Sequence, residues 1–336
     1  MTERVVENLN TGLSSTLEAS PRVFLLGEDI LDPYGGAFQA TRGLSLKFPE
    51  QVLSTPISEQ AIVALANGMA LAGDQPIVEI MFGDFLSLAF DQILNIGSKI
   101  PEMTGSRTAH QVVIRTPYGA HRGYGSTHSQ SLQKHFIGIP NIALYEMSPF
   151  HDSADVFSAM LHNQTLALHF ENKILYTKRF IDPNKPYDIF HIERLRGENN
   201  FVALKTTSKE FTNLVIICAG GLVHDAMATA RTQLIEHERE TTIVVPSKLY
   251  PLDLDPILSI CENTRQIVVI EEGIIGGSWG ETLAQSLYSK IWEQISNQIL
   301  LIGSRDFAIP SARHLEEEVV INPSRIQQLI NEAINE

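Results

Sequence analysis

The sequence predicts an α/β protein, with a doubly wound parallel sheet in its first part and a smaller α/β domain after it. Short apolar runs alternate with helical patterns through the first half, as in proteins whose parallel strands are joined by helices. The run at residues 112–114 is apolar at every position, which is typical of a strand covered on both faces. A chain of 336 residues is long for one compact domain and suits two.

The first domain is expected to alternate strands and helices from residue 23 onward. Helical patterns rich in Ala, Leu and Met lie at residues 59–72 and 85–96. Strands are expected at residues 23–28, 51–54, 76–80, 112–116, 142–146 and 174–177. Helices between successive strands favour parallel pairing, because a parallel connection has to return across the sheet.

Residues 182–212 differ in character from both flanking regions. They contain prolines at 183 and 186 and then charged residues with little periodicity, which predicts a segment that crosses between domains. Beyond it, strands are expected at 214–219, 242–245, 266–270 and 300–302, and helices at 223–237, 281–292 and 324–335. We therefore expect a first domain at 1–185, an inter-domain segment at 186–212 and a second domain at 213–336.

The composition limits the partners of this chain. A formal net charge of −14 argues against nucleic acid and against an anionic membrane, because phosphate groups demand a basic surface. No apolar stretch approaches the ~20 residues of a membrane helix, and the first residues do not have the pattern of a signal or transit peptide. Cys218 and Cys261 lie in separate apolar runs and are expected to be buried thiols. We expect a cytoplasmic protein.

Glu59 stands at the junction between an expected strand and an expected helix, in Thr55-Pro56-Ile57-Ser58-Glu59-Gln60. In an open α/β sheet, ligands bind at the carboxyl ends of the strands, where loops lead into helices. This position makes Glu59 a candidate functional carboxylate. A glutamate there also complements the positive end of the helix dipole, and that alternative stays open.

His128 lies in a glycine-rich polar loop that follows a buried strand, and such loops often carry function. His110, His121 and His135 lie close to it in the sequence, so a metal site has to be considered. Three of the four histidines recur at intervals of seven residues, which is not a usual ligand spacing, and no carboxylate or thiolate completes a set. Proton transfer is the better functional interpretation of His128.

Two further junctions carry weaker signals. Phe85 follows the expected strand at 76–80 and could stack on a flat heterocycle, although an aromatic at such a position is more often part of the core. The segment Gly276-Gly277-Ser278-Trp279-Gly280-Glu281 could cradle a phosphate, but it lacks the spacing of a dinucleotide fingerprint and the lysine of a P-loop. A tight strand-to-helix turn is the expected use of these glycines.

Several segments resemble the beta subunit of 2-oxo acid dehydrogenase E1 components. In the first half they are Leu26-Gly27-Glu28-Asp29, Tyr34-Gly35-Gly36-Ala37-Phe38, Thr55-Pro56-Ile57-Ser58-Glu59-Gln60, Phe90-Asp91-Gln92-Ile93, Arg115-Thr116-Pro117-Tyr118-Gly119 and His128-Ser129-Gln130-Ser131. In the second half they are Gly220-Gly221-Leu222-Val223, Tyr250-Pro251-Leu252-Asp253 and Glu271-Glu272-Gly273. The resemblance covers nearly the whole chain and implies a transketolase-like fold, with a pyrimidine-binding domain and a C-terminal domain.

The resemblance implies a role for each candidate residue at a thiamine diphosphate site. Glu59 is implied to hydrogen-bond the aminopyrimidine ring and so to activate the cofactor. Phe85 matches the position that stacks on the pyrimidine, and Ile57 and Met81 are assigned to the same cofactor site. His128 matches the histidine that faces the substrate and relays protons or assists acyl transfer.

The resemblance also implies partners. The sequence contains no Gly-Asp-Gly motif, so the diphosphate and Mg2+ are expected to be held mainly by an alpha subunit in an alpha2beta2 heterotetramer. The implied reaction decarboxylates a small 2-oxo acid such as pyruvate and reductively acylates a lipoyl group on an acyltransferase (E2). The family often holds a structural K+ through backbone carbonyls, and the isolated chain is expected to be inactive.

Some segments depart from the family pattern. They are residues 188–205, Pro246-Ser247-Lys248 and Ser304-Arg305-Asp306-Phe307. These departures affect the expected substrate and docking partner more than the cofactor. Two alternatives therefore stay open: a thiamine diphosphate-dependent synthase or ketol-transfer enzyme without a lipoyl acceptor, and a catalytically silent subunit.

Overall fold

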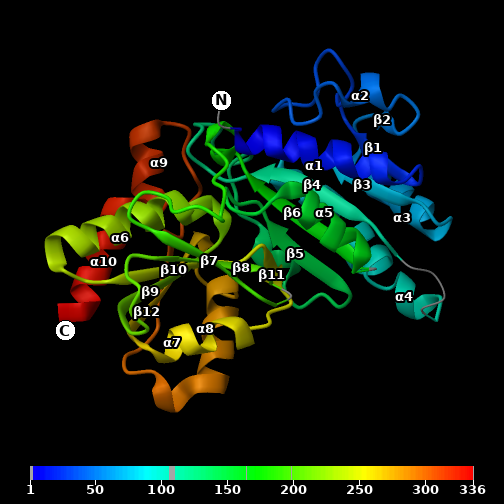
Figure 1. The fold of residues 1–336 in the computed structure, drawn as a ribbon. Helices are drawn as coiled ribbons and strands as arrows, with labels where there is room; N and C mark the ends of the chain where they lie inside the picture. Colours follow the sequence, from blue (N-terminus) through cyan, green and yellow to red (C-terminus); the bar gives the residue numbers. More distant parts are fainter. Residues whose placement is uncertain (1–2, 106–109, 164, 198, 336) are drawn as a thin grey trace. The chain divides into compact units, whose positions relative to one another are not determined.

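The computed structural model describes residues 3–105, 110–163, 165–197 and 199–335, and the chain forms two compact units (Figure 1). The first unit comprises Met1–Gly119 and Gly138–Phe180, and the second comprises Ala120–Ile137 and Ile181–Glu336. The loop that carries His128 therefore groups with the C-terminal part of the chain. The expected domain boundaries at 185 and 213 stay a prediction.

The first unit is built on a parallel sheet with the strand order β5-β6-β4-β3-β1-β2. The strands are β1 (Val23–Gly27), β2 (Val52–Ser54), β3 (Gln75–Glu79), β4 (Val113–Tyr118), β5 (Ile142–Glu146) and β6 (Leu166–Asn172). Every residue of β4, β5 and β6 is buried, which explains why the apolar runs show no alternation. The predicted parallel sheet is thus present in this unit.

Two helices, α1 (Val5–Ala19) and α5 (Ser153–His162), pack against each other and form one core with the sheet (Figure 1). Leu9, Leu13 and Leu17 recur at helical spacing on α1 and are all buried in this core. At the start of α5, Asp152 Oδ1 accepts a hydrogen bond of 2.9 Å from the Ala154 N–H, so the helix has a capped N-terminus.

The other helices of the first unit are shorter, except for α3 (Glu59–Leu71), which packs against β3. They are α2 (Leu44–Lys47), η1 (Gly83–Ala89), η2 (Gln92–Gly97), α4 (Ile100–Met103) and η4 (Leu175–Thr177). The helix expected at 85–96 is a 3-10 helix followed by a π-helix. The strand expected at 174–177 is wrong: that stretch forms η4, and the strand is the buried run of β6 before it.

The second unit has a mixed sheet with the strand order β13-β12-β9-β10-β8-β7. The strands of this unit are β7 (His191–Leu195), β8 (Phe201–Lys205), β9 (Thr212–Cys218), β10 (Thr241–Val245), β11 (Lys248–Tyr250), β12 (Thr264–Ile274) and β13 (Leu300–Ser304). β13, β12, β9 and β10 pair in parallel, whereas β8 pairs antiparallel with both β10 and β7.

Helices connect these strands and cover the sheet of the second unit. They are η3 (Gln133–Phe136), η5 (Gly220–Leu222), α6 (Val223–His237), η6 (Asp255–Ile257), α7 (Leu258–Glu262), α8 (Trp279–Ile291), η7 (Trp292–Gln294), α9 (Arg313–Val319) and α10 (Pro323–Asn335). α10 packs beside α6 (Figure 1). Across the described residues, no helix combines the length and the apolar character that crossing a membrane would require.

The β7–β8 hairpin lies within the stretch that was expected to be an irregular crossing segment. β7 is largely exposed and carries His191, Glu193 and Arg194. Charged side chains are typical of an edge strand, where they discourage pairing with another chain. Since only β8 has an apolar run, the charges of β7 hid the hairpin from a reading of the sequence.

Both cysteines are free thiols buried in the second unit, as expected. Burial, and to a lesser extent the charge of Glu262, raises the pKa of the Cys261 thiol to about 12. A thiol with such a high pKa is a poor nucleophile and a poor metal ligand at neutral pH. Cys261 therefore acts as a small apolar core residue.

Candidate functional site

Three carboxylates gather at the carboxyl edge of the first sheet. Gly27, the last residue of β1, lies in register with Ser54 at the end of β2 and with Glu79 at the end of β3. Glu28 directly follows β1, and Glu59 begins the helix α3 that follows β2. Glu28, Glu59 and Glu79 are buried, with exposed fractions of 7%, 8% and 3%. This is the edge at which open α/β sheets bind ligands.

Glu28 holds its proton more tightly than an ordinary carboxyl group. Burial is the main cause of its raised pKa, and the charges of Glu59, Asp29 and Glu79 add to it. Its Oε1 atom is buried and accepts no hydrogen bond from any described residue. A raised pKa means that Glu28 keeps its proton to a higher pH than an ordinary carboxyl group does.

Glu59 lies in the first turn of α3, where a carboxylate gains about 0.3–1 kcal/mol from the helix dipole. The N-cap residue Ser58 has an extended backbone and makes no capping hydrogen bond through its side chain. The same position places the carboxylate of Glu59 at the edge of the sheet where α/β proteins bind ligands.

The segment that contains Gly35 and Gly36 folds closely over Glu79. Both glycines have positive φ, +71° and +79°, and the Gly36 N–H donates a 3.0 Å hydrogen bond to the Asp29 carbonyl. A Cβ atom on Gly36 would lie 3.0 Å from Glu79 Oε1. Only glycine combines this backbone conformation with such a close approach.

A buried ion-pair network supports the acidic edge from inside the sheet. Arg115 on β4 binds Glu171 on β6 through Nε and Nη2, at 2.8 and 2.6 Å, and its Nη1 contacts Glu79. The Tyr176 hydroxyl donates to Glu171 Oε2 at 2.6 Å, and His169 Nδ1 lies 3.1 Å from Oε1. Arg115 thus ties together two carboxylates from different strands.

This network gives the carboxyl groups of Glu171 and Glu79 different affinities for protons. Burial alone would raise the pKa of Glu171, but Arg115 and the hydrogen bond with His169 lower it to about 2. Burial raises the pKa of Glu79, and the charge of Glu171 adds to it, although Arg115 opposes both. Arg115 was visible in the sequence as a charge within an apolar run, but its partners were missed because they come from other strands.

Phe85 belongs to a row of aromatic rings. It meets Phe82 edge-to-face, with ring centroids 5.9 Å apart, and Phe82 meets Phe38 in the same way at 5.9 Å. Phe85 and Met81 are half-buried, whereas Ile57 is 81% exposed. Phe85 is therefore partly a core residue, with ring surface left over for another contact.

His128 belongs to the second unit, whereas Glu59, Phe85, Ile57 and Met81 belong to the first. It is half-buried, and the Thr127 hydroxyl lies 2.9 Å from its Nδ1 atom. The neighbouring Ser129 is fully buried, and its Oγ has no hydrogen-bond partner among the described residues. The imidazole of His128 and the buried hydroxyl of Ser129 are thus adjacent in the sequence of this loop.

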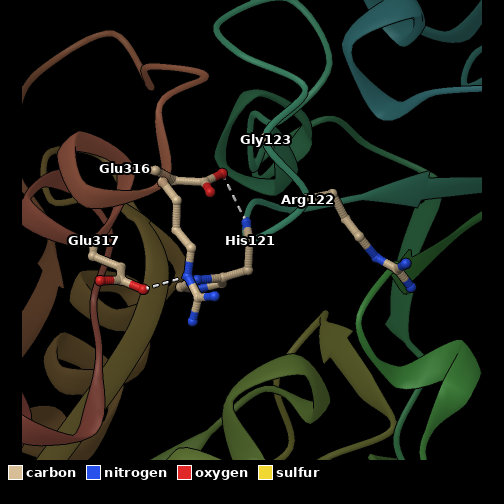
Figure 2. Close-up of a pocket in the computed structure, with 6 residues that line it drawn as sticks. His121, Arg122, Gly123, Glu316 and Glu317 are labelled. Carbon is tan, nitrogen blue, oxygen red and sulfur yellow. Dashed lines mark hydrogen bonds and ion pairs between the residues drawn. The ribbon is translucent and has the colours of Figure 1, made fainter.

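Two buried carboxylates hold the His128 loop in place. Glu272 Oε1, at the end of β12, accepts hydrogen bonds from the Ala120 N–H at 2.8 Å and from the Ser131 hydroxyl at 3.1 Å. Glu316 Oε1, on α9, accepts from the His121 N–H at 2.9 Å (Figure 2). Both carboxylates lie more than 140 residues from the loop in the sequence. Sequence reasoning did not identify either as a positioning residue.

A cavity lies next to this loop, and Figure 2 shows the residues around it. Its volume is about 500 Å³. It is lined by His121, Arg122, Gly123, Arg313, Glu316 and Glu317. Arg313 Nε pairs with Glu317 Oε1 at 2.9 Å across one helical turn, so the charges of this wall are largely satisfied within the chain. A second cavity of about 520 Å³ has Ser126, Ser131 and Glu272 in its wall.

The four histidines that are close in sequence divide between the two units: His110 belongs to the first, and His121, His128 and His135 belong to the second. His110 Nε2 lies 3.0 Å from Asn67 Oδ1 in the first unit, and burial lowers its pKa to about 4, so it is neutral at pH 7. The pKa of His135 is lowered first by burial and then by the charge of Lys134. Within the described ranges, no group of three His, Cys, Asp or Glu side chains has an arrangement that could hold a metal ion.

The glycine-rich turn before α8 is occupied by the chain itself. Glu281 Oε2 accepts hydrogen bonds from the N–H groups of Gly276, at 3.1 Å, and Ser278, at 3.0 Å. Ser278 Oγ in turn accepts from the Glu281 N–H at 3.4 Å, which completes a capping box. The side chain of Glu281 thus takes the place that a phosphate would need.

Comparisons with known proteins agree with the two-part architecture. The family model described as "Transketolase, pyrimidine binding domain" matches residues 5–179, and the model described as "Transketolase, C-terminal domain" matches residues 205–326. The structure titled "Split gene transketolase, inactive beta4 tetramer" covers 99% of both chains with a TM-score of 0.76. Its sequence identity is 17%, so this likeness concerns the fold.

Curated relatives extend the similarity over nearly the full chain. Pyruvate dehydrogenase E1 component subunit beta of Staurastrum punctulatum is 27% identical over 98% of this chain and 97% of its own length. Acetoin:2,6-dichlorophenolindophenol oxidoreductase subunit beta of Cupriavidus necator is 33% identical over 79% of this chain and 77% of its own. The Bacillus subtilis protein of the same name is 27% identical over 98% of this chain.

Proposed function

Since this chain belongs to the transketolase family, we propose that it is the beta subunit of a thiamine diphosphate-dependent 2-oxo acid dehydrogenase E1 component. The complex decarboxylates a small 2-oxo acid such as pyruvate and reductively acylates a lipoyl group on an acyltransferase partner. The observation that carries the proposal is the buried carboxylate of Glu59 at the carboxyl edge of the first sheet, with Glu28 beside it. The near full-length similarity to E1 beta subunits supports it.

The first unit has polar groups that suit the aminopyrimidine ring of the cofactor. Thr55 Oγ1 and Glu28 Oε1 are buried and lack hydrogen-bond partners among the described residues. Each lies near a strand end at the same edge as Glu59. Orphaned buried polar atoms are costly and are expected to find a partner when a ligand binds. These residues therefore fit a ring that carries both donors and acceptors.

Glu59 would accept a hydrogen bond from the aminopyrimidine ring and would hold or move a proton at its carboxyl oxygen. Bound thiamine diphosphate supplies the electron sink for decarboxylation. Glu28 lies near this carboxylate: burial raises the pKa of Glu28, and the negative charge of Glu59 adds to the effect. Phe85, Met81 and Ile57 would provide the apolar surface for the ring.

His128 acts on the substrate side of the reaction. An imidazole can donate a proton through one nitrogen and accept one through the other, which suits relay to a leaving or entering group. The Thr127 hydroxyl next to Nδ1 orients the ring. The buried carboxylates of Glu272 and Glu316 fix the loop backbone on either side of it.

An alpha subunit completes the site by holding the diphosphate and Mg2+. Helix α3 offers a surface for such a partner, because its outer face carries exposed small and apolar side chains in a helical stripe. These are Ala61, Ala64, Leu65, Gly68 and Leu71. Leu65 and Leu71 are 50% and 45% exposed, and no atom lies within 4 Å of a Cβ atom placed on Gly68. Such a face permits close packing of a partner helix, and we propose an alpha2beta2 assembly.

The proposal is tested by purifying the tagged chain from its own host, identifying its partners by mass spectrometry and assaying the purified complex with 2-oxo acids. The expected result is an alpha-type chain carrying Gly-Asp-Gly, a lipoyl acyltransferase, and 2-oxo acid-dependent reduction of an artificial electron acceptor. An alpha chain without an acyltransferase, and with activity on a 2-hydroxy ketone, would favour a second function. The 33% identity to an acetoin oxidoreductase beta subunit points to that alternative. No alpha chain at all would overturn both.

A further inference from the structure

Two arginines of the second unit lie near each other at the junction of β13 and α10. Arg305 directly follows β13, and Arg325 lies in the first turn of α10. The two elements pack together. The end of β13 is also hydrogen-bonded to the chain between α9 and α10: the Arg305 N–H donates to the Val319 carbonyl at 2.9 Å, and the Ile321 N–H donates to Ser304 Oγ at 3.4 Å. In the part of the chain that the structure describes, neither guanidinium forms an ion pair or a side-chain hydrogen bond.

Arg305 is exposed and Arg325 is half-buried, so the lack of a partner matters most for Arg325. The sequence has 39 Asp and Glu residues against 25 Lys and Arg residues, so acidic partners are abundant. Yet Nη1 of Arg325 is buried without a hydrogen-bond partner among the described residues. Burial first, and then the nearby charge of Arg305, lower the pKa of Arg325. A bound anion would offset both the desolvation and the repulsion between like charges.

Another arginine in the same unit shows how the chain normally satisfies such a group. The pKa of Arg239 is also lowered by burial and by a neighbouring arginine, Arg265. However, its Nη1 donates to Gln233 Oε1 at 3.1 Å and to Asn331 Oδ1 at 3.0 Å. The chain thus supplies acceptors for Arg239 and leaves the Arg325 guanidinium without one among its described residues.

A cavity with an apolar wall begins at Arg305. Its volume is about 400 Å³, within the usual range for small-molecule sites. It is lined by Arg305, Asp306, Phe307, Pro310, Leu315, Glu318 and Val319. Phe307 and Leu315 are 65% and 42% exposed, which leaves apolar surface for a ligand. The carboxylates of Asp306 and Glu318 disfavour an anion that carries more than one charge.

We propose that Arg305 and Arg325 bind the carboxylate of a small monocarboxylic acid that has an apolar chain. The carboxylate accepts hydrogen bonds from the two guanidinium groups, whose planar donor geometry suits a carboxylate. The apolar chain lies in the cavity against Phe307 and Leu315. This site shares no residue with the proposed thiamine diphosphate site, so either proposal can fail without the other.

The test is isothermal titration of the purified full-length chain with octanoate, octanamide and inorganic phosphate. Octanoate is expected to bind at one site, and both Arg305→Gln and Arg325→Gln are expected to weaken it by roughly tenfold or more. Arg313→Gln is the matched control, because Arg313 is exposed and pairs with Glu317 within its own helix. Arg325→Lys keeps the charge and is expected to retain part of the affinity if Arg325→Gln folds poorly.

Three results would overturn the proposal. The first is no octanoate binding to the wild-type chain at millimolar concentration. The second is a loss of octanoate affinity in Arg313→Gln that equals the loss in the other variants. Unchanged octanoate affinity in Arg305→Gln and Arg325→Gln, when both variants melt at the wild-type temperature, would count equally. The third is octanamide or phosphate binding as tightly as octanoate, since octanamide lacks the carboxylate and phosphate lacks the apolar chain.

Discussion

Glu28 and Glu59 follow neighbouring parallel strands whose ends lie in register, and their buried carboxyl groups repel each other. The fold thus brings together two like charges that lie 31 positions apart in the sequence. Such a pair is tolerated where a proton or a ligand neutralises one member. This relationship is the physical basis of the proposed proton exchange with the cofactor.

Replacing Glu28 by glutamine should remove a pH-dependent cost of folding. The folded-state pKa of Glu28 is raised, so the folded chain binds the proton more tightly than the unfolded chain. The free energy of unfolding therefore falls as the pH rises from the ordinary carboxyl pKa through the raised pKa of Glu28. Glu28→Gln is therefore expected to gain stability relative to the wild type above that window. Urea unfolding between pH 4 and pH 8 measures the difference. A constant difference across this range would contradict the raised pKa.

Replacing Arg115 by methionine should destabilise the first unit by about 3–5 kcal/mol, because it leaves Glu79 and Glu171 buried without their cation. The comparison is with Arg313→Gln, which removes an exposed pair worth less than about 1 kcal/mol. Denaturant unfolding of both variants at pH 7 gives the values. Equal effects would mean that the network does not stabilise the fold.

The same network predicts the acid stability of the wild type. The folded-state pKa of Glu171 is lowered to about 2, so its contribution is fully present above the ordinary carboxyl pKa and is lost as pH falls toward 2. In Glu171→Gln this loss should be absent, although the variant is less stable at pH 7. Unfolding curves of both proteins between pH 2 and pH 6 test the prediction, and parallel curves would refute it.

Replacing Phe85 by alanine should weaken cofactor binding by about 2- to 10-fold, which corresponds to the 0.5–1.5 kcal/mol of a ring–ring contact. Turnover at saturating cofactor should change less. Titration of the assembled complex with thiamine diphosphate gives the affinity. Phe211→Ala, which removes a 54% exposed ring from the second unit, is the control and should bind normally. Equal affinity in both variants would remove Phe85 from the site.

Replacing Gly36 by alanine combines an unfavourable backbone with a close contact to Glu79. Gly43 provides a control, because its φ is +83° and no atom lies within 4 Å of an added Cβ. Gly43→Ala measures the backbone strain alone, about 1 kcal/mol or somewhat more. Gly36→Ala is expected to be less stable than Gly43→Ala and to shift the pH dependence of activity. Identical melting temperatures would mean that the contact with Glu79 is unimportant.

The fold class could be predicted from the sequence because buried parallel strands appear in it as uninterrupted apolar runs. β5 has the expected bounds, and β4 begins one residue and ends two residues later than expected. The β7–β8 hairpin was missed because the exposed strand is charged, and η4 was taken for a strand because three-residue apolar stretches fit either structure. Local patterns thus identify elements whose burial is uniform.

Single site residues could be predicted from the sequence, but the way they group in the structure could not. Glu59 was visible from its place between a strand and a helix. Its neighbour Glu28 and the Arg115 network depend on strand order and register, which bring distant residues together and leave no local pattern. The carboxylates that hold the His128 loop are likewise remote in sequence. The roles of Glu59, Phe85, Ile57, Met81 and His128 stay predictions.

The central claim is that Glu59 exchanges a proton with the bound cofactor, and Glu59→Gln tests it most directly. The complex of this chain with its alpha partner should assemble and bind thiamine diphosphate, yet decarboxylate its 2-oxo acid at least about 100-fold more slowly than the wild type. Glu50→Gln, which changes an exposed carboxylate of the same unit, should be fully active. Decarboxylation at the wild-type rate by an assembled Glu59→Gln complex would contradict the account.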